Sequence, residues 1–166
     1  MLTGNLLDLL SEAAKNGPSK GITAYHSGGG GSNTSFLTYE NLLAQSKQRS
    51  MQIRKLVGVE KKVVLMYFAD HLESITWFWA IIYAGAVPCI CPRLSQDLER
   101  RKESIGHLRQ LLEEPLIITS KTLTSEFSGL DCPKILSTGE FFILATMNSR
   151  LFNFLYSCRE FCRKFL

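Results

Sequence analysis

Three short apolar runs alternate with longer stretches of helical spacing in the middle of the chain. Residues 63–68 form a continuous apolar run of strand length, typical of a strand buried on both faces. Residues 86–91 and 116–119 are similar runs. Residues 72–83 and the stretch from Ser95 onward have the spacing of helices. This order predicts an α/β fold, a partial doubly wound sheet with a parallel β-α-β-α-β core.

A short helix and a hairpin precede this core. Residues 6–14 carry leucine and alanine at helical spacing, and Gly17 with Pro18 ends the pattern. Residues 22–25 and the apolar pair Phe36 and Leu37 flank a glycine-rich stretch, which predicts a hairpin with a long connection.

The glycine-rich stretch, residues 28–32, is interpreted as a linker. It lacks the Lys-Ser/Thr ending of a phosphate loop and does not open a helix. Thr38 follows the hairpin as the predicted N-cap of a longer helix, and Gly58 is its predicted end.

The carboxyl ends of the predicted strands are the expected place for a ligand, because ligands of parallel sheets bind there. These ends are Ala69-Asp70-His71, Pro92-Arg93 and Ser120-Lys121. The turn after the first strand contains no glycine, so the fingerprint of a dinucleotide-binding site is missing.

Composition excludes several classes of protein. The 166 residues are 45% hydrophobic and 20% charged, as in one ordinary globular domain. The net charge of +4 is modest and its basic residues are interspersed with acidic ones, so no nucleic-acid partner is expected. Five cysteines, an odd number, predict reduced structural cysteines and a reducing compartment, the cytoplasm.

Residues 75–92 are a candidate membrane span, because they hold no charged residue and reach about the minimum spanning length. Gly85 and Pro88 interrupt this stretch, and Glu73 and Arg93 flank it. A buried helix followed by a buried strand has the same composition, so no membrane span is expected here.

Several motifs, in order, resemble the adenylate-forming superfamily of acyl-CoA synthetases, luciferases and peptide-synthetase adenylation domains. Residues 37–42 (LTYENL) resemble its early L-T-Y-x-E-L helix start. Residues 58–65 resemble its G-V-x-x-G-D-x-V strand entry, with Lys61 or Lys62 as a departure. Residues 83–88 (YAGAVP) resemble K-A-G-A-V-x-V-P, and residues 92–94 resemble the N-P-x-L that follows.

A finer pattern is similar to fungal peptide-synthetase-like adenylation domains and reductases. Its members are aromatic, apolar, histidine and strand residues: Phe68, His71, Leu72, Ile75, Trp77, Phe78, Trp79, His107, Leu108, Leu111, Leu112, Pro115, Ile117, Ile118 and Thr119. The resemblance covers about residues 20–136.

The resemblance implies an N-terminal fragment of an AMP-dependent synthetase/ligase. Residues 1–136 would be the N-terminal portion of an AMP-binding domain, and residues 137–166 an atypical apolar and basic tail. For this tail three interpretations stay open: a helix packed on the sheet, a membrane-surface helix, or sequence that is not native coding sequence.

The family's chemistry needs groups that this sequence does not contain. A Ser/Thr/Gly-rich loop ending in Lys meets the ATP phosphates, and an aromatic-Gly-x-Thr-Glu stretch, an Asp and a C-terminal Lys complete the site. Residues 137–140 (STGE) are the nearest match to the phosphate loop, but no second glycine or Lys follows. We therefore predict no catalytic, cofactor-binding or metal residues and no cofactor for the fragment, whereas the complete family enzyme uses ATP and Mg²⁺.

Other chemistry has weaker support. Asp70 and His71 are adjacent, and neighbours at a helix start do not face each other, so His71 is interpreted as structural. His107 is expected to pack on an apolar helix face, and His26 to be solvated. Three dispersed histidines disfavour a metal site. The aromatic run 77–79 is expected in the core.

Three functional hypotheses follow. The first is a truncated ligase fragment, inactive alone, with a larger synthetase or a chaperone as its partner. The second is a small adenylation-like interaction module that pairs with a larger synthetase. The third and weakest is a membrane-associated protein that uses residues 75–92 and the basic tail.

Overall fold

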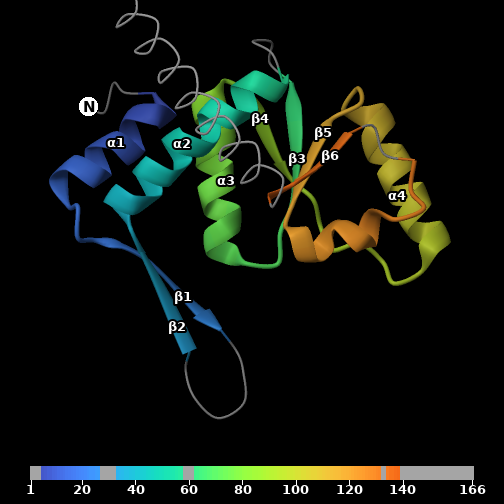
Figure 1. Ribbon diagram of the computed structural model, residues 1–166, viewed down its shortest axis with the longest axis horizontal. Helices are drawn as coiled ribbons and strands as arrows, with labels where there is room; N and C mark the ends of the chain where they lie inside the picture. The colour runs from blue at the N-terminus through green and yellow to red at the C-terminus, as the bar shows by residue number, and fades with distance from the viewer. Residues whose placement is uncertain (1–4, 27–32, 58–61, 132–133, 139–166) are drawn as a thin grey trace, which may run out of the picture.

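The computed structural model describes residues 5–26, 33–57, 62–131 and 134–138 (Figure 1). The helices of this part are α1 (Leu6–Asn16), α2 (Tyr39–Val57), α3 (His71–Ala84), α4 (Leu98–Leu111) and the 3-10 helix η1 (Lys121–Phe127). Its strands are β1 (Gly21–His26), β2 (Asn33–Thr38), β3 (Val63–Tyr67), β4 (Val87–Ile90), β5 (Leu116–Thr119) and β6 (Lys134–Ser137).

Strands β3 to β6 form a parallel sheet in the order β4-β3-β5-β6. The predicted parallel β-α-β-α-β core is thus confirmed as β3-α3-β4-α4-β5. Strand β6, which pairs with β5 from Leu116↔Lys134 to Thr119↔Ser137, was not predicted. Because the strands are all parallel, their carboxyl ends meet at one edge of the sheet.

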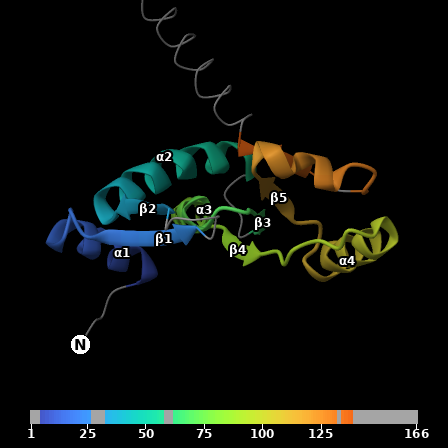
Figure 2. The same ribbon diagram turned by 90° about the horizontal axis from the view of Figure 1, so that it is seen from below.

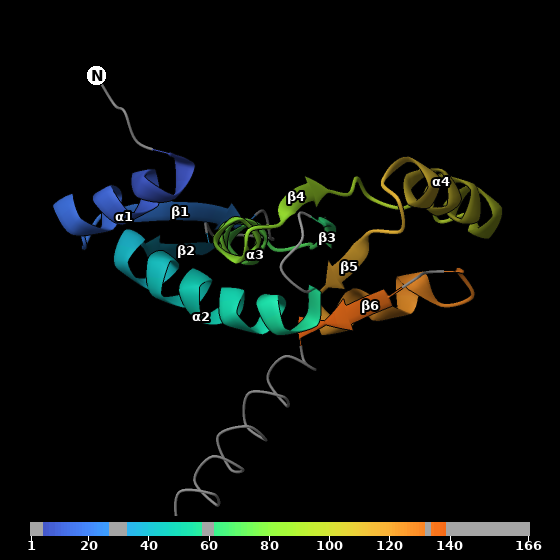
Figure 3. The same cartoon turned by 90° about the horizontal axis from the view of Figure 1, so that it is seen from above.

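Helices cover both faces of the sheet (Figure 2, Figure 3). Val64 and Met66 of β3 point into a core shared with α2 and α3, while the alternating Leu65 and Tyr67 point into a second core. The second core includes Ile105 of α4 and residues of η1. This alternation follows from the two-residue period of a strand.

Strand β4 is an edge strand, and the prediction of a fully buried run at residues 86–91 is wrong. Val87 is 48% exposed and Ile90 is 66% exposed, because β4 pairs with β3 on one side. Cys91, directly after the strand, is buried. Residues 75–92 are divided between α3, a turn and β4, and no helix in the described ranges is long and apolar enough to cross a membrane.

Gly85 ends α3 in the left-handed conformation, with φ 85°. Nothing lies within 4 Å of a Cβ built on this residue. The left-handed backbone conformation, and not a close approach of another segment, is therefore what requires glycine here.

The predicted hairpin is confirmed. β1 and β2 pair antiparallel from Gly21↔Thr38 to His26↔Asn33, and the hairpin extends away from the sheet (Figure 1). A Cβ on Gly21 would lie 2.1 Å from the Leu37 carbonyl oxygen, so glycine is needed for the strands to approach.

The helix starts agree with capping chemistry. The Asn41 N–H donates to Thr38 Oγ1 at 3.1 Å, which confirms the predicted N-cap of α2, while its predicted end at Gly58 lies outside the described residues. Helix α4 begins at Leu98, later than predicted, because Asp97 rather than Ser95 caps it, accepting from the Arg100 N–H at 2.9 Å.

The predicted apolar face of α4 is only partly buried. Ile105 is buried, but Leu98 and Leu111 are exposed. Leu108 and Leu112 pack against the same core as Ile105, so only part of the apolar face of α4 is turned to the core.

Candidate functional site at the carboxyl edge of the sheet

Two polar clusters lie at the carboxyl edge, one on each face of the sheet. The Arg49 cluster consists of Arg49, Glu73 and Trp77, from α2 and α3. The Tyr67 cluster joins Tyr67, Leu94, Arg101 and Glu126, from β3, the β4–α4 connection, α4 and η1.

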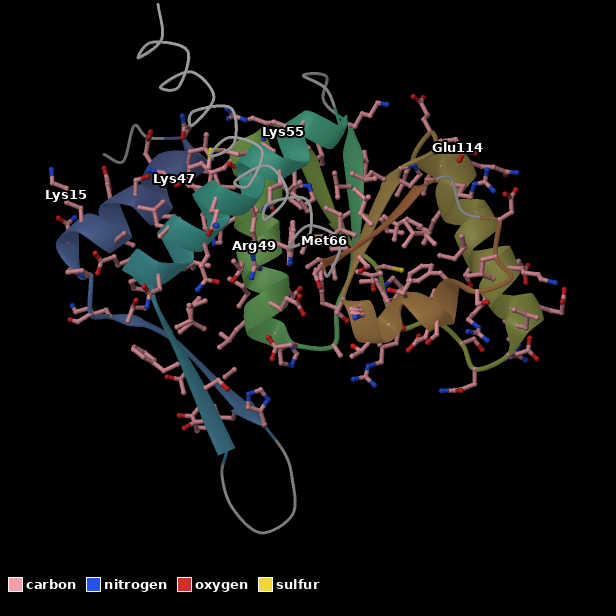
Figure 4. All side chains as sticks on the ribbon, viewed as in Figure 1. Lys15, Lys47, Arg49, Lys55, Met66 and Glu114 are labelled. Carbon is pink, nitrogen blue, oxygen red and sulfur yellow. The ribbon has the colours of Figure 1, made fainter. Side chains whose placement is uncertain are left out.

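Arg49 reaches from α2 over α3 (Figure 4). Its Cζ atom lies 4.9 Å from the centroid of the Trp77 ring, a cation–π contact, and Trp77 is only 2% exposed. The Nη1 atom of Arg49 is buried and has no hydrogen-bond partner among the described residues. Burial lowers the pKa of Arg49, and the negative charge of Glu73 opposes that effect.

Glu73 lies in the first turn of α3, where its backbone N–H donates to Asp70 Oδ1 at 2.6 Å. Burial raises the pKa of the Glu73 carboxyl. The charge of Arg49 and hydrogen bonds with the side chains of Thr138 and Trp77 act in the opposite direction, and the nearby Asp70 carboxylate raises the pKa further. Glu73 is thus a half-buried carboxylate whose pKa is set mainly by burial, opposed by the charge of Arg49.

Tyr67 organises the opposite face. Its hydroxyl donates to Glu126 Oε2 and accepts from the Leu94 N–H at 3.4 Å. Its ring meets Phe127 edge-to-face at a centroid distance of 5.3 Å. Burial, followed by the hydrogen bond to Glu126, raises the pKa of Tyr67. One phenol therefore joins β3 to η1 and to the β4–α4 connection.

Arg101 completes the Tyr67 cluster from α4. Its Nη1 donates to the Glu126 carbonyl oxygen at 3.0 Å, while its buried Nε has no hydrogen-bond partner within the described ranges. The contact with a backbone carbonyl fixes η1 against α4.

Comparisons with known proteins connect this architecture to one enzyme family. No family model matches the chain. The nonribosomal peptide synthetase acyN of Ascocoryne sarcoides is 36% identical over 132 residues, 79% of this chain and 14% of that protein. The aspulvinone E synthetase melA of Aspergillus terreus is 32% identical over 124 residues, 74% of this chain and 13% of that protein.

Solved structures of similar fold lead to the same family as the sequence relatives. The adenylation domain of a keto acid-selecting peptide-synthetase module, bound to a keto acyl adenylate, superposes with a TM-score of 0.69 at 25% identity. The match covers 84% of this chain and 26% of that one. The chain belongs to the adenylate-forming (AMP-binding) family. A fatty acid AMP ligase from Legionella pneumophila, at 20% identity and a TM-score of 0.63, shares the fold.

The polar residues considered in the sequence, Asp70 and the histidines, have structural surroundings. Asp70 is the N-cap of α3, and His71 is exposed beside it. His107 is exposed, so the expectation that it packs on an apolar face is wrong. His26 is half-buried and its Nε2 is hydrogen-bonded to Ser35 Oγ at 2.8 Å, rather than simply solvated.

No metal site is assembled in the described part of the chain, and one of its cysteines, Cys91, is held as a thiol. No group of three His, Cys, Asp or Glu residues there is placed to hold a metal ion. Cys89 and Cys91 are free and lie on the same side of the sheet. Burial, and then the neighbouring Cys89, raises the pKa of Cys91 to about 11, so its thiol is protonated and weakly nucleophilic at neutral pH.

The predicted carboxyl-end residues do meet at one edge. Arg93 and Lys121 are exposed there, and Ser137 is buried at the end of β6. Thr138 is half-buried, whereas Gly139 and Glu140, the rest of the segment that resembles a phosphate loop, lie outside the described residues. The prediction that the chain carries no catalytic residue stays a prediction.

Sequence reasoning missed Arg49, although a signal was available. Arg49 shares a helix face with Leu42, Ser46 and Ile53, which are all buried, so a cation falls on the core-facing stripe of α2. Tyr67 was placed correctly in a buried strand, but no local pattern points to its partners across η1.

Proposed function

We propose that this chain forms the N-terminal part of an adenylation domain and does not activate an acid by itself. The observation that carries the proposal is the match of 84% of the chain to 26% of a solved adenylation domain. The chain spans only 14% and 13% of the two fungal relatives, so the activity of a whole relative is an inference here. The complete domain would join a carboxylate to ATP, releasing pyrophosphate and forming an acyl-adenylate for transfer to a thiol.

The state of the carboxyl edge supports this proposal. Glu73 and Tyr67, two partly buried ionisable groups near the edge, are both engaged with neighbouring side chains. Because these two groups already interact with neighbouring side chains, their role would be structural. Phosphate binding and proton transfer would then depend on residues in the rest of the domain. ATP and Mg²⁺ would bind to that complete domain.

The same proposal includes the domain bounds, the partner protein and the cellular compartment. Residues 1–136 would be the adenylation-domain portion, and residues 137–166 a tail of different character. The partner would be a larger synthetase, or a chaperone that covers the apolar surface. We place the protein in the cytoplasm, since its cysteine count and the free Cys89 and Cys91 fit a reducing compartment.

Complementation tests the proposal. The chain is mixed with a shortened acyN adenylation domain that lacks the homologous segment, and carboxylate-dependent ATP–pyrophosphate exchange is measured. We expect exchange from the mixture and none from either part. A chain carrying Ile117→Asp, which places a carboxylate in the sheet core, is the control that removes folding and should remove exchange. Exchange by the chain alone would contradict the proposal.

A second candidate function is an interaction module that pairs with a larger synthetase. The hairpin favours it: Tyr25 is 75% exposed and Phe36 is 57% exposed. The two side chains lie on one face of the hairpin. Phe36 is directly opposite Thr23 in the neighbouring strand, and Tyr25, two residues after Thr23, lies on the same face as Thr23. Exposed aromatic residues on one face are typical of a binding surface.

This second function predicts a stable complex that depends on the hairpin. Tyr25→Ser with Phe36→Ser should abolish co-elution with the intact acyN adenylation domain while leaving the thermal midpoint of the chain unchanged. Thr34→Ser, on the same face, is the matched control. Co-elution that survives the double substitution would remove the hairpin from consideration.

A further inference from the structure

We propose that the outer edge of strand β1 binds an extended strand from the complementary part of an adenylation domain, which extends the β1–β2 hairpin into a larger sheet. The choice of partner rests on the proposed function, because the chain matches only 26% of a solved adenylation domain and the remainder of that domain lies outside the match.

The hairpin has the form of an unfinished sheet. β1 and β2 form a two-stranded sheet of their own, which extends away from the body of the molecule (Figure 1). On one face Ala24 is buried, whereas Thr23, Tyr25 and Phe36 on the other face are exposed. Two-stranded hairpins are marginally stable by themselves, so a third strand would stabilise this one.

The bonding pattern of the hairpin shows which main-chain groups point outward. The Tyr39 N–H donates to the Lys20 carbonyl oxygen at 2.7 Å, so these two residues form a bonded pair in register with the hairpin. Bonded and non-bonded pairs alternate along an antiparallel ladder, and residues of non-bonded pairs direct their N–H and C=O groups outward. The non-bonded pairs here are Gly21↔Thr38, Thr23↔Phe36 and Tyr25↔Thr34.

β1 presents the longer outer edge. Gly21, Thr23 and Tyr25 all direct their main-chain groups to it, and within the described ranges no backbone hydrogen bond joins these N–H groups to a residue outside the hairpin. On β2 the corresponding edge is cut short at Thr38, where the chain turns into α2 and the Thr38 side chain caps that helix. A partner strand therefore has more bonding groups available on β1.

Neither hairpin strand is protected against strand addition. Natural edge strands are usually protected by charged residues or proline, and β1 (GITAYH) and β2 (NTSFLT) contain no Lys, Arg, Asp, Glu or Pro.

The edge strand β4 shows the protection that the hairpin lacks. The Val87 N–H donates to the Lys62 carbonyl oxygen at 3.0 Å. The Cys91 N–H donates to the Met66 carbonyl oxygen at 2.8 Å, so the odd-numbered residues of β4 face β3. Pro88 lies at an outward-facing position and has no N–H to offer. The molecule thus blocks strand addition at β4 and leaves β1 open to it.

The chemistry of the edge defines the partner segment. Main-chain hydrogen bonds to β1 would supply the affinity, as in other cases of strand addition. Tyr25 and Phe36 lie on one face of an uncharged hairpin, so the added strand would place apolar side chains on that face, because a charge there would be desolvated without a partner.

Amide hydrogen exchange of the full chain, with and without the shortened acyN adenylation domain, tests the inference. In the complex the N–H groups of Thr23 and Tyr25 should exchange at least about tenfold more slowly than in the chain alone, because each gains a hydrogen bond. The N–H groups of Thr34 and Phe36 point to the opposite edge, so their exchange should change less than about twofold.

Two proline variants give a matched pair for binding measurements. Thr23→Pro removes an outward N–H from β1, and the control Thr34→Pro removes one from β2, while both keep the bonds within the hairpin. Thr23→Pro should weaken binding of the shortened domain roughly tenfold, and Thr34→Pro less than about twofold. Thr23→Val keeps the N–H and should bind as the original chain does. If Thr23→Pro disrupts the hairpin, the amide protection in the unsubstituted chain decides.

Each outcome has a separate meaning. Absence of binding, unprotected Thr23 and Tyr25 in the complex, protection of Thr34 and Phe36 in their place, or equal weakening by the two proline variants would overturn the inference. Protection that appears in the chain alone as its concentration rises would identify a second copy as the occupant and overturn the choice of partner.

ATP–pyrophosphate exchange separates this inference from the proposed function. Exchange by the mixture with Thr23 and Tyr25 unprotected would overturn only the binding edge, whereas protection without ATP–pyrophosphate exchange would overturn only the proposed function. If the shortened domain is insoluble, a chimera in which this chain replaces the homologous segment of acyN serves for the same amide measurement.

Discussion

The Arg49 cluster and the Tyr67 cluster brace the same sheet edge with different chemistry. On the α2/α3 face a cation and a carboxylate are half-buried around Trp77, so the contacts depend on charge. On the α4/η1 face a phenol bonds one carboxylate and one backbone amide, and Arg101 bonds a backbone carbonyl. The first face should respond to pH and to charge substitutions, and the second to the loss of single hydrogen bonds.

The largest effect is expected from Trp77→Ala. Trp77 is buried at the centre of the α2/α3 core and supports the guanidinium of Arg49. Removing such a side chain costs about 3–5 kcal/mol in the free energy of unfolding. Urea denaturation measures it, with the half-buried Trp79→Ala as a control that should cost less. Equal costs for the two variants would contradict the central place of Trp77.

Removing one member of the charged pair should have the next largest effect. Arg49→Met keeps much of the side-chain volume but leaves the half-buried Glu73 without its cation. We expect a loss of about 1–2 kcal/mol, between the values for surface and fully buried pairs. Combining Arg49→Met with Glu73→Gln should recover part of that loss. Strictly additive losses in denaturant titrations would exclude coupling between the two charges.

Tyr67→Phe tests the other face. It deletes the hydroxyl that donates to Glu126 and accepts from Leu94, and it should cost about 1 kcal/mol. Unlike the Arg49→Met loss, this loss should stay constant from mildly acidic to neutral pH, since the pKa of Tyr67 is raised above its usual value of 10.0. If the stability loss of Tyr67→Phe varied across this pH range, the contacts on the α4/η1 face would depend on charge as those on the α2/α3 face do, and the contrast between the two faces would be wrong.

Stability should fall as the pH rises through the titration of Glu73. The pKa of Glu73 is raised in the folded chain above its ordinary 4.5, so the folded state holds this proton more tightly than the unfolded state. The resulting contribution is fully present below 4.5 and is lost as the pH rises through the folded value. Glu73→Gln should flatten this part of the curve, measured as unfolding midpoints against pH, and an unchanged curve would contradict it.

Cys91 should make the stability of the folded chain depend on pH in the alkaline range as well. Its pKa is raised from 9.0 to about 11, so its stabilising contribution is present below pH 9 and declines between pH 9 and pH 11. Cys91→Ala should reduce that decline. In iodoacetamide labelling at mildly alkaline pH, the half-buried Cys89 should react before Cys91. Faster labelling of Cys91 would contradict its burial.

The smallest effect is expected at Arg109, away from both clusters. Arg109 bonds Glu114 with two nitrogen–oxygen contacts of 2.9 and 2.8 Å and pairs with the exposed Asp131 at 2.6 Å. Although the contacts are short, they lie at the surface, where water and salt screen them. Arg109→Met should shift the thermal midpoint less than Tyr67→Phe does, and a larger shift would show that this surface network matters more than the edge.

Elements with a strong local pattern could be predicted from the sequence. The apolar run at 63–68 and the capping Thr38 each act within a few residues, and the corresponding elements formed. Strand β6 was missed because four residues after a 3-10 helix carry little periodicity. The exposure of β4 was missed because an apolar run does not reveal whether the strand lies at an edge.

The candidate site depends on contacts between distant segments. Arg49 meets Trp77, and Tyr67 meets Glu126, only after the helices and the sheet have assembled. Neither pair has a spacing that a local pattern can report. The sequence therefore predicted the edge at which these residues gather but not the residues that brace it.

Carboxylate-dependent ATP–pyrophosphate exchange, measured on the purified chain over a panel of keto, amino and fatty acids, tests the central claim most directly. We predict background exchange with every acid for the chain alone, and exchange that appears when the complementary part of a relative's adenylation domain is added. Exchange by the chain alone that disappears in Trp77→Ala would contradict the claim, because it would mean that this chain contains a working active site.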